Sequence, residues 1–164
     1  FTPLLSRDSL TWRAMHLPPS RCHKKSSEFS FLRGHAILLG YGRAGRQTLQ
    51  SLIEHGLESV VVDDDAAVVA RLQHQGVHAV QGDGSDARIL KLVNARHASA
   101  VLCSMRRSRD AKVALKLLRP GRAKVIVRTF EPREAKHVRS LGGLPVDTSE
   151  AATRSFLDWF ESNK

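Results

Sequence analysis

The sequence predicts an α/β fold: a doubly wound parallel sheet of six strands with helices on both faces. From His35 onward, short runs rich in valine, leucine and isoleucine alternate with stretches of helical periodicity, the order in which strand–helix–strand units build a parallel sheet. The first apolar run leads directly into a glycine-rich turn at 40–45, and an amphipathic helix pattern follows. Right-handed crossovers then give the strand order 3-2-1-4-5-6, with the turn at the carboxyl edge where the order reverses.

The elements follow one another in a regular order. We expect strands at 36–39, 59–63, 77–81, 100–103, 124–129 and 144–147, and helices at 44–55, 65–75, 86–93, 108–118, 132–141 and 149–162.

Local signals set several of the early boundaries. Gly56 and Gly76 stand where the first two helices should end, because glycine readily adopts the left-handed conformation found at helix C-termini. Asp64 or Asp65 can cap the second helix and Ser85 can cap the third, since their side-chain oxygens accept bonds from backbone N–H groups.

Prolines and aromatic residues mark the later helices. Pro120-Gly121 ends the fourth helix, and Pro132 suits the first turn of the fifth, where a missing N–H group is tolerated. The last helix carries apolar side chains on one side, namely Ala152, Phe156, Trp159 and Phe160. We interpret this stripe as packing, within the domain or against a second copy of the chain.

The glycine-rich turn fits the dinucleotide fingerprint of Rossmann-like folds. Gly40 permits a tight turn, Gly42 lets the backbone approach a pyrophosphate, and Gly45 lets the helix pack close to the strand. The helix N-terminus offers unpaired N–H groups and partial positive charge to phosphate. Asp63, 18 residues beyond Gly45, ends the second strand and would accept hydrogen bonds from an adenosine ribose. Clustered glycines alone often mean only a turn, but the strand, the helix and the acid together favour nucleotide binding.

Two acidic segments follow the second and third strands. In Asp63-Asp64-Asp65, the first acid is best placed for a ribose and would repel a 2′-phosphate, which disfavours NADP. The segment Gly82-Asp83-Gly84-Ser85-Asp86 lies at the same carboxyl edge. It is either a turn with a helix cap or a contact for the adenine or its ribose through Asp83, and the sequence leaves both open.

Four further residues lie near this edge. Arg43, inside the glycine-rich turn, either contacts phosphate, reaches a partner subunit or is simply solvated. Cys103 and Ser104 end the fourth strand beside the crevice; a cysteine there is most often a small buried apolar residue, and nothing nearby indicates a catalytic thiolate. Arg128, near the end of the fifth strand, either approaches a bound phosphate or is a surface residue.

Length, charge and cysteine number limit the classes of protein to which the chain can belong. The chain has 164 residues, a formal net charge of +10 and two cysteines, too few for a disulfide framework. No apolar run approaches the roughly 20 residues that span a bilayer. Residues 1–33 contain Pro18-Pro19, several serines and scattered basic residues, and we expect them to form a linker.

The stretch 106–124 is strongly basic. Its cations, with Asp110 as the single acid among them, are Arg106, Arg107, Arg109, Lys112, Lys116, Arg119, Arg122 and Lys124. The spacing of the middle four, 109, 112, 116 and 119, places them on one helix face. A solvated face is the usual meaning, and anionic lipid, nucleic acid or an acidic partner subunit are the functional alternatives. We disfavour nucleic acid because no aromatic residues are interleaved and no helix-turn-helix pattern is present.

The sequence favours a nucleotide sensor over an enzyme. A short-chain dehydrogenase needs Tyr-x-x-x-Lys, but the single tyrosine is Tyr41 and Gly45 stands four positions later. Beyond the six strands we find no substrate domain, and the chain has no Ser-His-Asp spacing, paired-carboxylate helix or histidine-rich metal site. The alternative is a small NAD-dependent oxidoreductase, or an accessory subunit of one.

With these residues placed, the stretch 35–146 resembles the regulator-of-potassium-conductance (RCK) nucleotide-binding domain, also called the TrkA N-terminal or KTN domain. The resemblance rests on Gly-Tyr-Gly-Arg-x-Gly at 40–45, Val-Val-Val-Asp-Asp-Asp at 60–65, Arg-Leu-x-x-x-Gly-Val at 71–77, Gly-Asp-Gly-Ser-Asp at 82–86 with Leu90 following, and Val-Ile-Val-Arg at 125–128 before a helix ending in Leu-Gly-Gly at 141–143. Such domains are cytoplasmic regulators of potassium channels and transporters. They form dimers or larger rings and bind NAD(H), AMP, ADP or ATP.

The resemblance also implies a site. Phosphates would lie against Gly40, Gly42, Arg43 and Gly45 and the ribose against Asp63, with the adenine end near Asp83 and Gly84 and with Cys103-Ser104 at the border. The full set of candidate cofactor-binding residues is Gly40, Tyr41, Gly42, Arg43, Ala44, Gly45, Asp63, Asp64, Asp83, Gly84, Cys103 and Ser104. The expected ligand is NAD(H) or AMP, with ADP and ATP as alternatives, and the expected assembly is a homodimer.

Two positions depart from the family pattern. Asp110 stands near the place where many members have an asparagine, and Gly84 stands where alanine is usual. The first residues, Phe-Thr-Pro-Leu-Leu at 1–5, are similar to the cytoplasmic end of the last membrane helix in Kef-type cation–proton antiporters. We therefore expect 1–33 to be a linker following a membrane transporter domain absent from this chain. Residues 34–164 would be the nucleotide-binding domain, acting on a potassium or cation–proton antiporter at the cytoplasmic face of the membrane.

Overall fold

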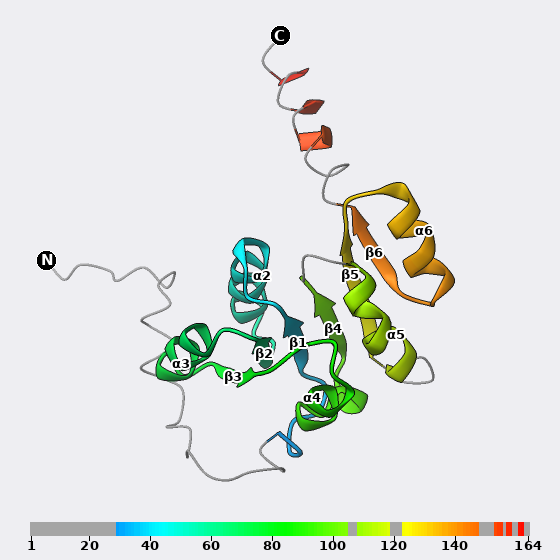
Figure 1. Ribbon diagram of the computed structural model, residues 1–164. Helices are drawn as coiled ribbons and strands as arrows, with labels where there is room; N and C mark the ends of the chain where they lie inside the picture. Colours follow the sequence, from blue (N-terminus) through cyan, green and yellow to red (C-terminus); the bar gives the residue numbers. More distant parts are fainter. Residues whose placement is uncertain are drawn as a thin grey trace, which may run out of the picture.

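One parallel sheet of six strands organises the protein. The computed structural model describes residues 29–104, 108–118, 123–147, 153–155, 157–158 and 161–162. Within these residues the strand order is β3-β2-β1-β4-β5-β6, and every neighbouring pair is parallel (Figure 1). The predicted fold class and strand order are confirmed.

The first half of the chain covers one face of the sheet. It runs through β1 (Ala36–Leu39), α2 (Arg43–Glu54), β2 (Ser59–Asp63), α3 (Ala66–His74) and β3 (His78–Gln81). Alternate residues of a strand point to opposite faces, so every second strand residue packs under α2 and α3. This smaller core consists of Leu38, Leu49, Val61, Val69, Leu72 and Ala79.

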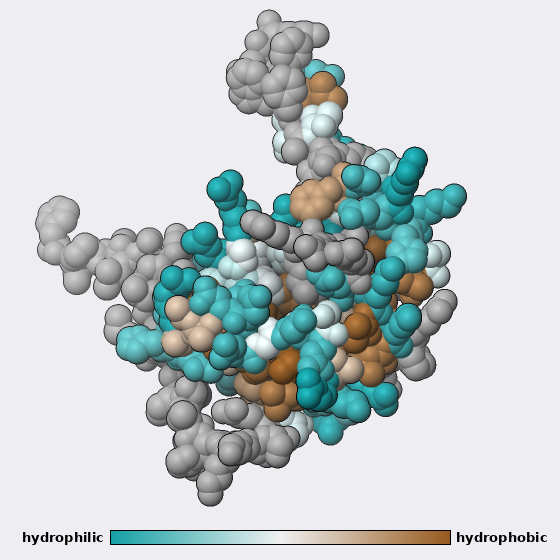
Figure 2. Space-filling model, in the orientation of Figure 1, coloured by the Kyte–Doolittle hydropathy of each residue, from teal (hydrophilic) through white to brown (hydrophobic). Residues whose placement is uncertain are grey.

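The second half covers the other face. It runs through α4 (Ala87–Leu92), the 3₁₀ turn η1 (Ala95–His97), β4 (Ala100–Cys103), the 3₁₀ turn η2 (Ser108–Ala111), α5 (Lys112–Leu118), β5 (Lys124–Thr129), α6 (Pro132–Ser140) and β6 (Leu144–Asp147). A larger core joins α4, α5 and α6 to the central strands. The surface over α3 and α6 is mainly hydrophilic, and hydrophobic patches lie over α4 and α5 (Figure 2).

The central strand β1 anchors both cores. All four of its residues are buried, and Ile37, Leu38 and Leu39 have no exposed surface. Burial of each such side chain contributes about 1.5–3 kcal/mol. The larger core also takes in Phe29 and Leu32, which lie just before the position at which we expect the domain to begin. The rest of the expected linker, 1–28, lies outside the described residues.

Most helix boundaries have the predicted causes. Gly56 and Gly76 adopt φ values of +72° and +78°, and α2 and α3 end just before them. Asp65 caps α3, because one of its carboxylate oxygens accepts from the N–H groups of Ala67 at 2.8 Å and Val68 at 3.3 Å. Pro132 lies in the first turn of α6.

The predicted cap of α4 is wrong. Asp86 caps this helix by accepting from the Arg88 N–H at 2.8 Å. Ser85 lies one residue before the cap position and donates its hydroxyl to the carboxylate of Asp83 at 2.7 Å. The Arg88 guanidinium also bonds to Asp86 and lowers the pKa of that carboxyl.

Some expected features fall outside the described residues. The described residues between 153 and 162 are helical, whereas Ala152, Phe156, Trp159 and Phe160 are not described. The same holds for Pro120-Gly121, for Arg106, Arg107, Arg119 and Arg122, and for the side chain of Arg109. Lys112, Lys116 and Lys124 of the basic stretch are exposed. Among the described helices, none has the length and apolar character needed to cross a bilayer.

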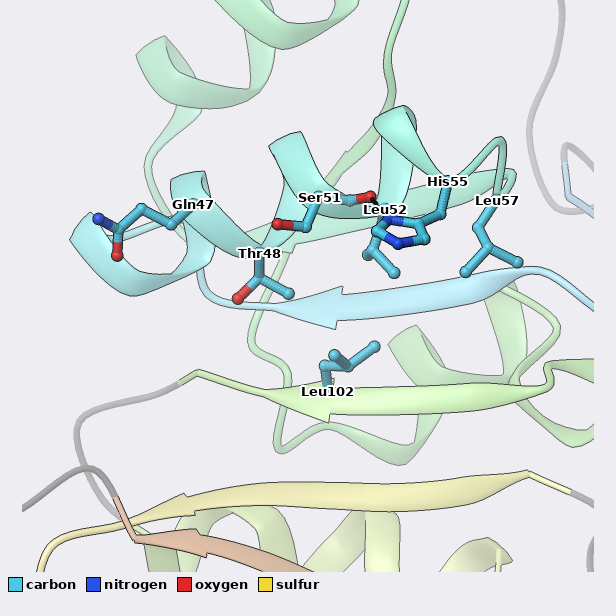
Figure 3. Close-up of a pocket in the computed structure, with 7 residues that line it drawn as sticks. All are labelled: Gln47, Thr48, Ser51, Leu52, His55, Leu57 and Leu102. Atoms are coloured by element: carbon cyan, nitrogen blue, oxygen red, sulfur yellow. Dashed lines mark hydrogen bonds between the residues drawn. The ribbon is translucent and has the colours of Figure 1, made fainter. Parts of the chain in front are cut away.

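Half of one sheet face has no helix over it within the described residues. On the side covered by α2 and α3, the row Leu102, Ile126 and Leu144 crosses β4, β5 and β6 in register. Leu144 is 51% exposed and Val146 is 48% exposed. A hollow of about 410 Å³ lies where this open half meets α2, with residues of α2 on one side and Leu102 of β4 on the other (Figure 3). We call this surface the open half-face.

Candidate nucleotide-binding site

The glycine-rich turn joins β1 to α2 at the carboxyl edge of the sheet. Gly40 has φ of +92°, a left-handed conformation that strongly favours glycine. Its N–H donates to the carbonyl of Val62 at 2.8 Å, which ties the turn to the end of β2. The reason predicted for glycine at position 40 therefore agrees with the geometry.

Gly45 and Gly42 serve different purposes. A Cβ on Gly45 would collide with the carbonyl oxygen of Gly40, so the first turn of α2 can approach β1 only because position 45 has no side chain. A Cβ on Gly42 would meet nothing within 4 Å, and its φ of −70° suits any residue. Position 42 thus leaves free space in front of the helix.

The N-terminus of α2 is open. Gly42 is its N-cap, no side chain caps the helix, and no acidic residue lies in its first turn. The first N–H groups of a helix have no partner within the helix, so here they face the space in front of Gly42. Ala44 lies within this turn, and its carbonyl accepts from the Thr48 hydroxyl at 3.0 Å. Arg43 is exposed at the start of α2.

Asp63 lies beside this opening and holds the turn in place. One of its carboxylate oxygens accepts from the N–H of Tyr41 at 2.6 Å, and the other accepts from the N–H of Asp65 at 3.0 Å. A carboxylate can accept about four hydrogen bonds, so two acceptor positions remain. The sequence predicted a ribose contact for this acid and did not predict its bond to the turn.

The segment after β3 forms a turn that is stabilised by its own acid. Asp83 accepts from the N–H of Ser85 at 2.7 Å and also from its hydroxyl, Gly84 is buried, and the N–H of Gly82 donates to the carbonyl of Asp63 at 2.9 Å. Of the two interpretations left open, the turn with a helix cap is present. Asp64 is exposed next to this segment.

The end of β4 closes the edge on the other side. Cys103 is buried, and burial raises the pKa of its thiol to about 12, so the sulfur is neutral at physiological pH and is a poor nucleophile. The N–H of Ser104 donates to the carbonyl of Leu39 at 2.9 Å. The Ser104 hydroxyl oxygen is buried, and no described residue forms a hydrogen bond with it.

Backbone bonds therefore bring four segments into one row. Gly82 bonds to Asp63, Gly40 to Val62 and Ser104 to Leu39, so the candidate residues from the ends of β3, β2, β1 and β4 share the carboxyl edge. Parallel sheets of this kind bind ligands in the crevice outside that edge, at the point where the strand order reverses. The sequence placed these residues together correctly.

Comparison with known proteins identifies the family. Residues 36–148 match the sequence profile of the TrkA-N domain. The chain belongs to the TrkA-N domain family. The resemblance expected from the sequence is thereby confirmed, and the TrkA-N match covers the whole sheet together with the glycine-rich turn.

Three proteins of known description are similar to this TrkA-N domain. YbaL of Escherichia coli, assigned as a cation/proton antiporter, is 25% identical over 134 residues, which are 78% of this chain and 24% of YbaL. This chain thus spans about a quarter of that relative. The crystal structure of the TrkA-N domain of inner membrane protein YbaL has a TM-score of 0.75 at 22% identity, covering 79% of this chain and 98% of that one.

The other two relatives were solved with nucleotides. The Kef C-terminal domain of Shewanella denitrificans in its AMP-bound form has a TM-score of 0.65 at 18% identity, covering 74% of this chain and 75% of that one. The GsuK channel bound to NAD has a TM-score of 0.65 at 23% identity, covering 77% of this chain and 23% of that one. GsuK has also been solved bound to ADP. At these identities the likeness establishes the shared fold.

Proposed function

We propose that this TrkA-N domain is a nucleotide-sensing regulatory domain that controls a potassium or cation–proton antiporter. Its ligand is an adenine nucleotide, NAD(H) or AMP, with ADP and ATP as alternatives. The observation that carries the proposal is the open N-terminus of α2, which lies directly beside the Asp63 carboxylate. Donors for phosphate and an acceptor for ribose thus stand next to each other.

The geometry supports one orientation of the ligand. Phosphate lies over Gly40–Gly45, where Gly42 leaves space and Arg43 adds positive charge. The ribose hydroxyls donate to the free acceptor positions of Asp63, and the adenine lies toward Asp83 and Gly84. The ligands of the AMP-bound Kef domain and of NAD-bound GsuK support this class of nucleotide.

Regulation rather than catalysis fits the residues at this edge. The one cysteine here is neutral and buried, and the ring of the turn's tyrosine packs against the smaller core. Neither supplies a proton-transfer pair for hydride chemistry. Turnover of NADH with small carbonyl compounds or quinones above about 1 s⁻¹, an ordinary enzyme rate, would favour the alternative of a small NAD-dependent oxidoreductase or its accessory subunit.

The relatives support a place beside a membrane. YbaL is an inner membrane protein assigned as a cation/proton antiporter. We infer that this domain works at the cytoplasmic face of the membrane, joined to a transporter domain of the same full-length chain through the linker at 1–33, and that it acts as a homodimer.

The ribose contact can be tested without altering the protein. Calorimetric titration should show that AMP binds more tightly than 2′-deoxy-AMP by about 1.5–3 kcal/mol, the contribution of a hydrogen bond to a charged group. NADPH should bind more weakly than NADH, because Asp63 repels a 2′-phosphate. The comparison is needed because an Asp63→Ala variant would also release the bond to Tyr41 and loosen the turn.

Titration of the Asp63→Ala variant with both ligands completes the test, because two proteins and two ligands form a thermodynamic cycle. In Asp63→Ala the preference for AMP over 2′-deoxy-AMP should disappear, whatever happens to the overall affinity. Glu58→Ala is the matched control and should keep the preference, because this exposed acid precedes β2 at the opposite edge of the sheet. Equal binding of AMP and its deoxy form to the wild-type protein would remove the ribose role from Asp63, and absence of binding by every nucleotide would refute the proposed function.

A further inference from the structure

Arg128, at the carboxyl end of β5, has no counter-ion among the residues that the structure describes. The guanidinium carbon of Arg128 lies 4.4 Å from the centroid of the Phe130 ring, so the side chain leans along the strand toward the edge that holds the glycine-rich turn. Its Nε atom is buried and has no hydrogen-bond partner among the described residues. A buried donor that is left unsatisfied is costly, so this guanidinium is a candidate to receive an acceptor from a ligand.

Ser104 presents a second donor in the same state. Its hydroxyl oxygen is buried without a hydrogen-bond partner among the residues that the structure covers. A Cβ built on Gly45 would lie 3.6 Å from this oxygen, so the hydroxyl faces the first turn of α2. The pairing of Cys103 with Val127 puts Ser104 and Arg128 side by side on neighbouring strand ends, which lie about 4.8 Å apart in a sheet.

Both side chains lie on the face that carries α2. Cys103 and Val127 belong to the larger core on the opposite face, and the residues that follow them in the chain point the other way. The row from Gly42 through Ser104 to Arg128 therefore runs along one side of one edge. It offers helix N–H groups, then a hydroxyl, then a guanidinium.

Charge divides along this edge. The ends of β2 and β3 carry the acids Asp63, Asp64 and Asp83, whereas the ends of β1, β4 and β5 carry Arg43, Ser104 and Arg128. The next acids, Glu131 and Asp147, lie beyond Arg128, after β5 and at the end of β6. A ligand that lies along the edge must place hydroxyl donors over β2 and negative charge over β1 to β5. A single phosphate at α2 would leave Ser104 and Arg128 unsatisfied.

We propose that Ser104 and Arg128 form a subsite for the second phosphate of a diphosphate, as carried by ADP and NAD(H). This inference rests on the proposed function, because it needs a nucleotide whose first phosphate lies at α2. The planar guanidinium, held by the Phe130 ring, donates to phosphate oxygens in a fixed geometry. The Ser104 hydroxyl donates from the neighbouring strand. The subsite makes the domain respond to diphosphates in preference to AMP.

Calorimetric titration with AMP, ADP and NADH tests the subsite. The wild-type protein should bind ADP and NADH at least about tenfold more tightly than AMP, as expected for charge-assisted bonds to phosphate. Arg128→Gln should bring the ADP-to-AMP ratio close to one while leaving the AMP affinity unchanged. Ser104→Ala should lower the ratio by about threefold to tenfold. Arg128→Lys keeps the charge without the planar fork and should give an intermediate ratio.

Lys124→Gln is the matched control. Lys124 is an exposed cation on the same strand and the same face, at the opposite edge, so its loss should leave the ADP-to-AMP ratio unchanged. The subsite is refuted if Arg128→Gln and Ser104→Ala both retain the wild-type ratio, or if the wild-type protein binds AMP as tightly as ADP. Either result leaves the proposed function standing, because AMP still binds. The ratio is read within each variant, so a loss of folded protein does not imitate the effect.

Discussion

At the scale of single residues, the three glycines of the turn are glycine for three separate reasons. Gly40 needs its left-handed backbone, Gly45 needs the missing Cβ so that α2 can approach β1, and Gly42 has neither constraint. Nothing in the protein itself explains glycine at position 42. The space that it leaves is where the phosphate of the proposed ligand would lie.

This difference predicts opposite outcomes for two alanine variants. Gly45→Ala should lower the free energy of unfolding by about 1–3 kcal/mol or more, as overpacking does, because the new methyl group meets the Gly40 carbonyl. Gly42→Ala should change it by less than about 0.5 kcal/mol and should weaken AMP binding. Denaturant melts and calorimetry measure the two effects. Unchanged AMP affinity in Gly42→Ala would move the phosphate away from this turn.

The residue roles missed by the sequence have a common cause. Asp63 bonds to Tyr41 at 2.6 Å, and Asp86 replaces Ser85 as the cap of α4 with a bond of 2.8 Å. Both depend on the exact positions of atoms in the folded chain. The unsatisfied state of Ser104 and Arg128 is likewise a property of the packed fold. Spacing along a chain predicts which segments meet, but it does not specify which acceptor takes which donor.

At the scale of elements, α3 is stabilised by its cap as well as by the burial of Val69 and Leu72. The helix has nine residues and no acid in its first turn, and isolated helices of this length are marginal in water. Asp65 accepts from two N–H groups at the start of α3. The backbone of this same residue donates to Asp63, so the cap also connects the helix to the candidate ribose site.

Removal of the cap should therefore be measurable. Asp65→Ala should lower the free energy of unfolding by about 0.5–2 kcal/mol. Asp64→Ala should have almost no effect, because this neighbour is exposed and caps nothing. Thermal melts of the two variants against the wild-type protein provide the comparison. Equal losses in both would mean that removing negative charge, rather than the cap, is responsible.

The strands and helices were the features of this structure that the sequence predicted best. Parallel strands covered on both faces read as continuous apolar runs, and Ala36–Leu39 and Ser59–Asp63 were found within the predicted limits for this reason. Glycine and proline then fixed the helix ends. The sequence did not reveal that, among the described residues, no helix covers one face of β4, β5 and β6. That gap follows from crossovers that carry α4, α5 and α6 to the other face.

At the scale of the whole molecule, the open half-face bears on assembly. Leu144 and Val146 expose about half of their surfaces on it, and the hollow between α2 and Leu102 lies on the same face of the sheet, with β5 between. Exposed apolar patches of this kind often mark protein–protein contacts. The surface supports a homodimer in which two copies bring their open half-faces together, because a two-fold axis pairs each patch with itself.

Light scattering at several protein concentrations can test this assembly. The wild-type domain should have the mass of a dimer, and the double variant Leu144→Glu/Val146→Glu should have the mass of a monomer, because buried unpaired carboxylates oppose association. The variant should stay folded, since both side chains are exposed in the single chain. Phe31→Glu is the control: Phe31 is also exposed, at 65%, but lies before β1, remote in sequence from β6.

A monomeric wild-type domain, with and without nucleotide, would contradict the dimer. A dimer that survives the double variant would assign assembly to another surface, and nucleotide sensing would then have to reach the transporter without passing through this face.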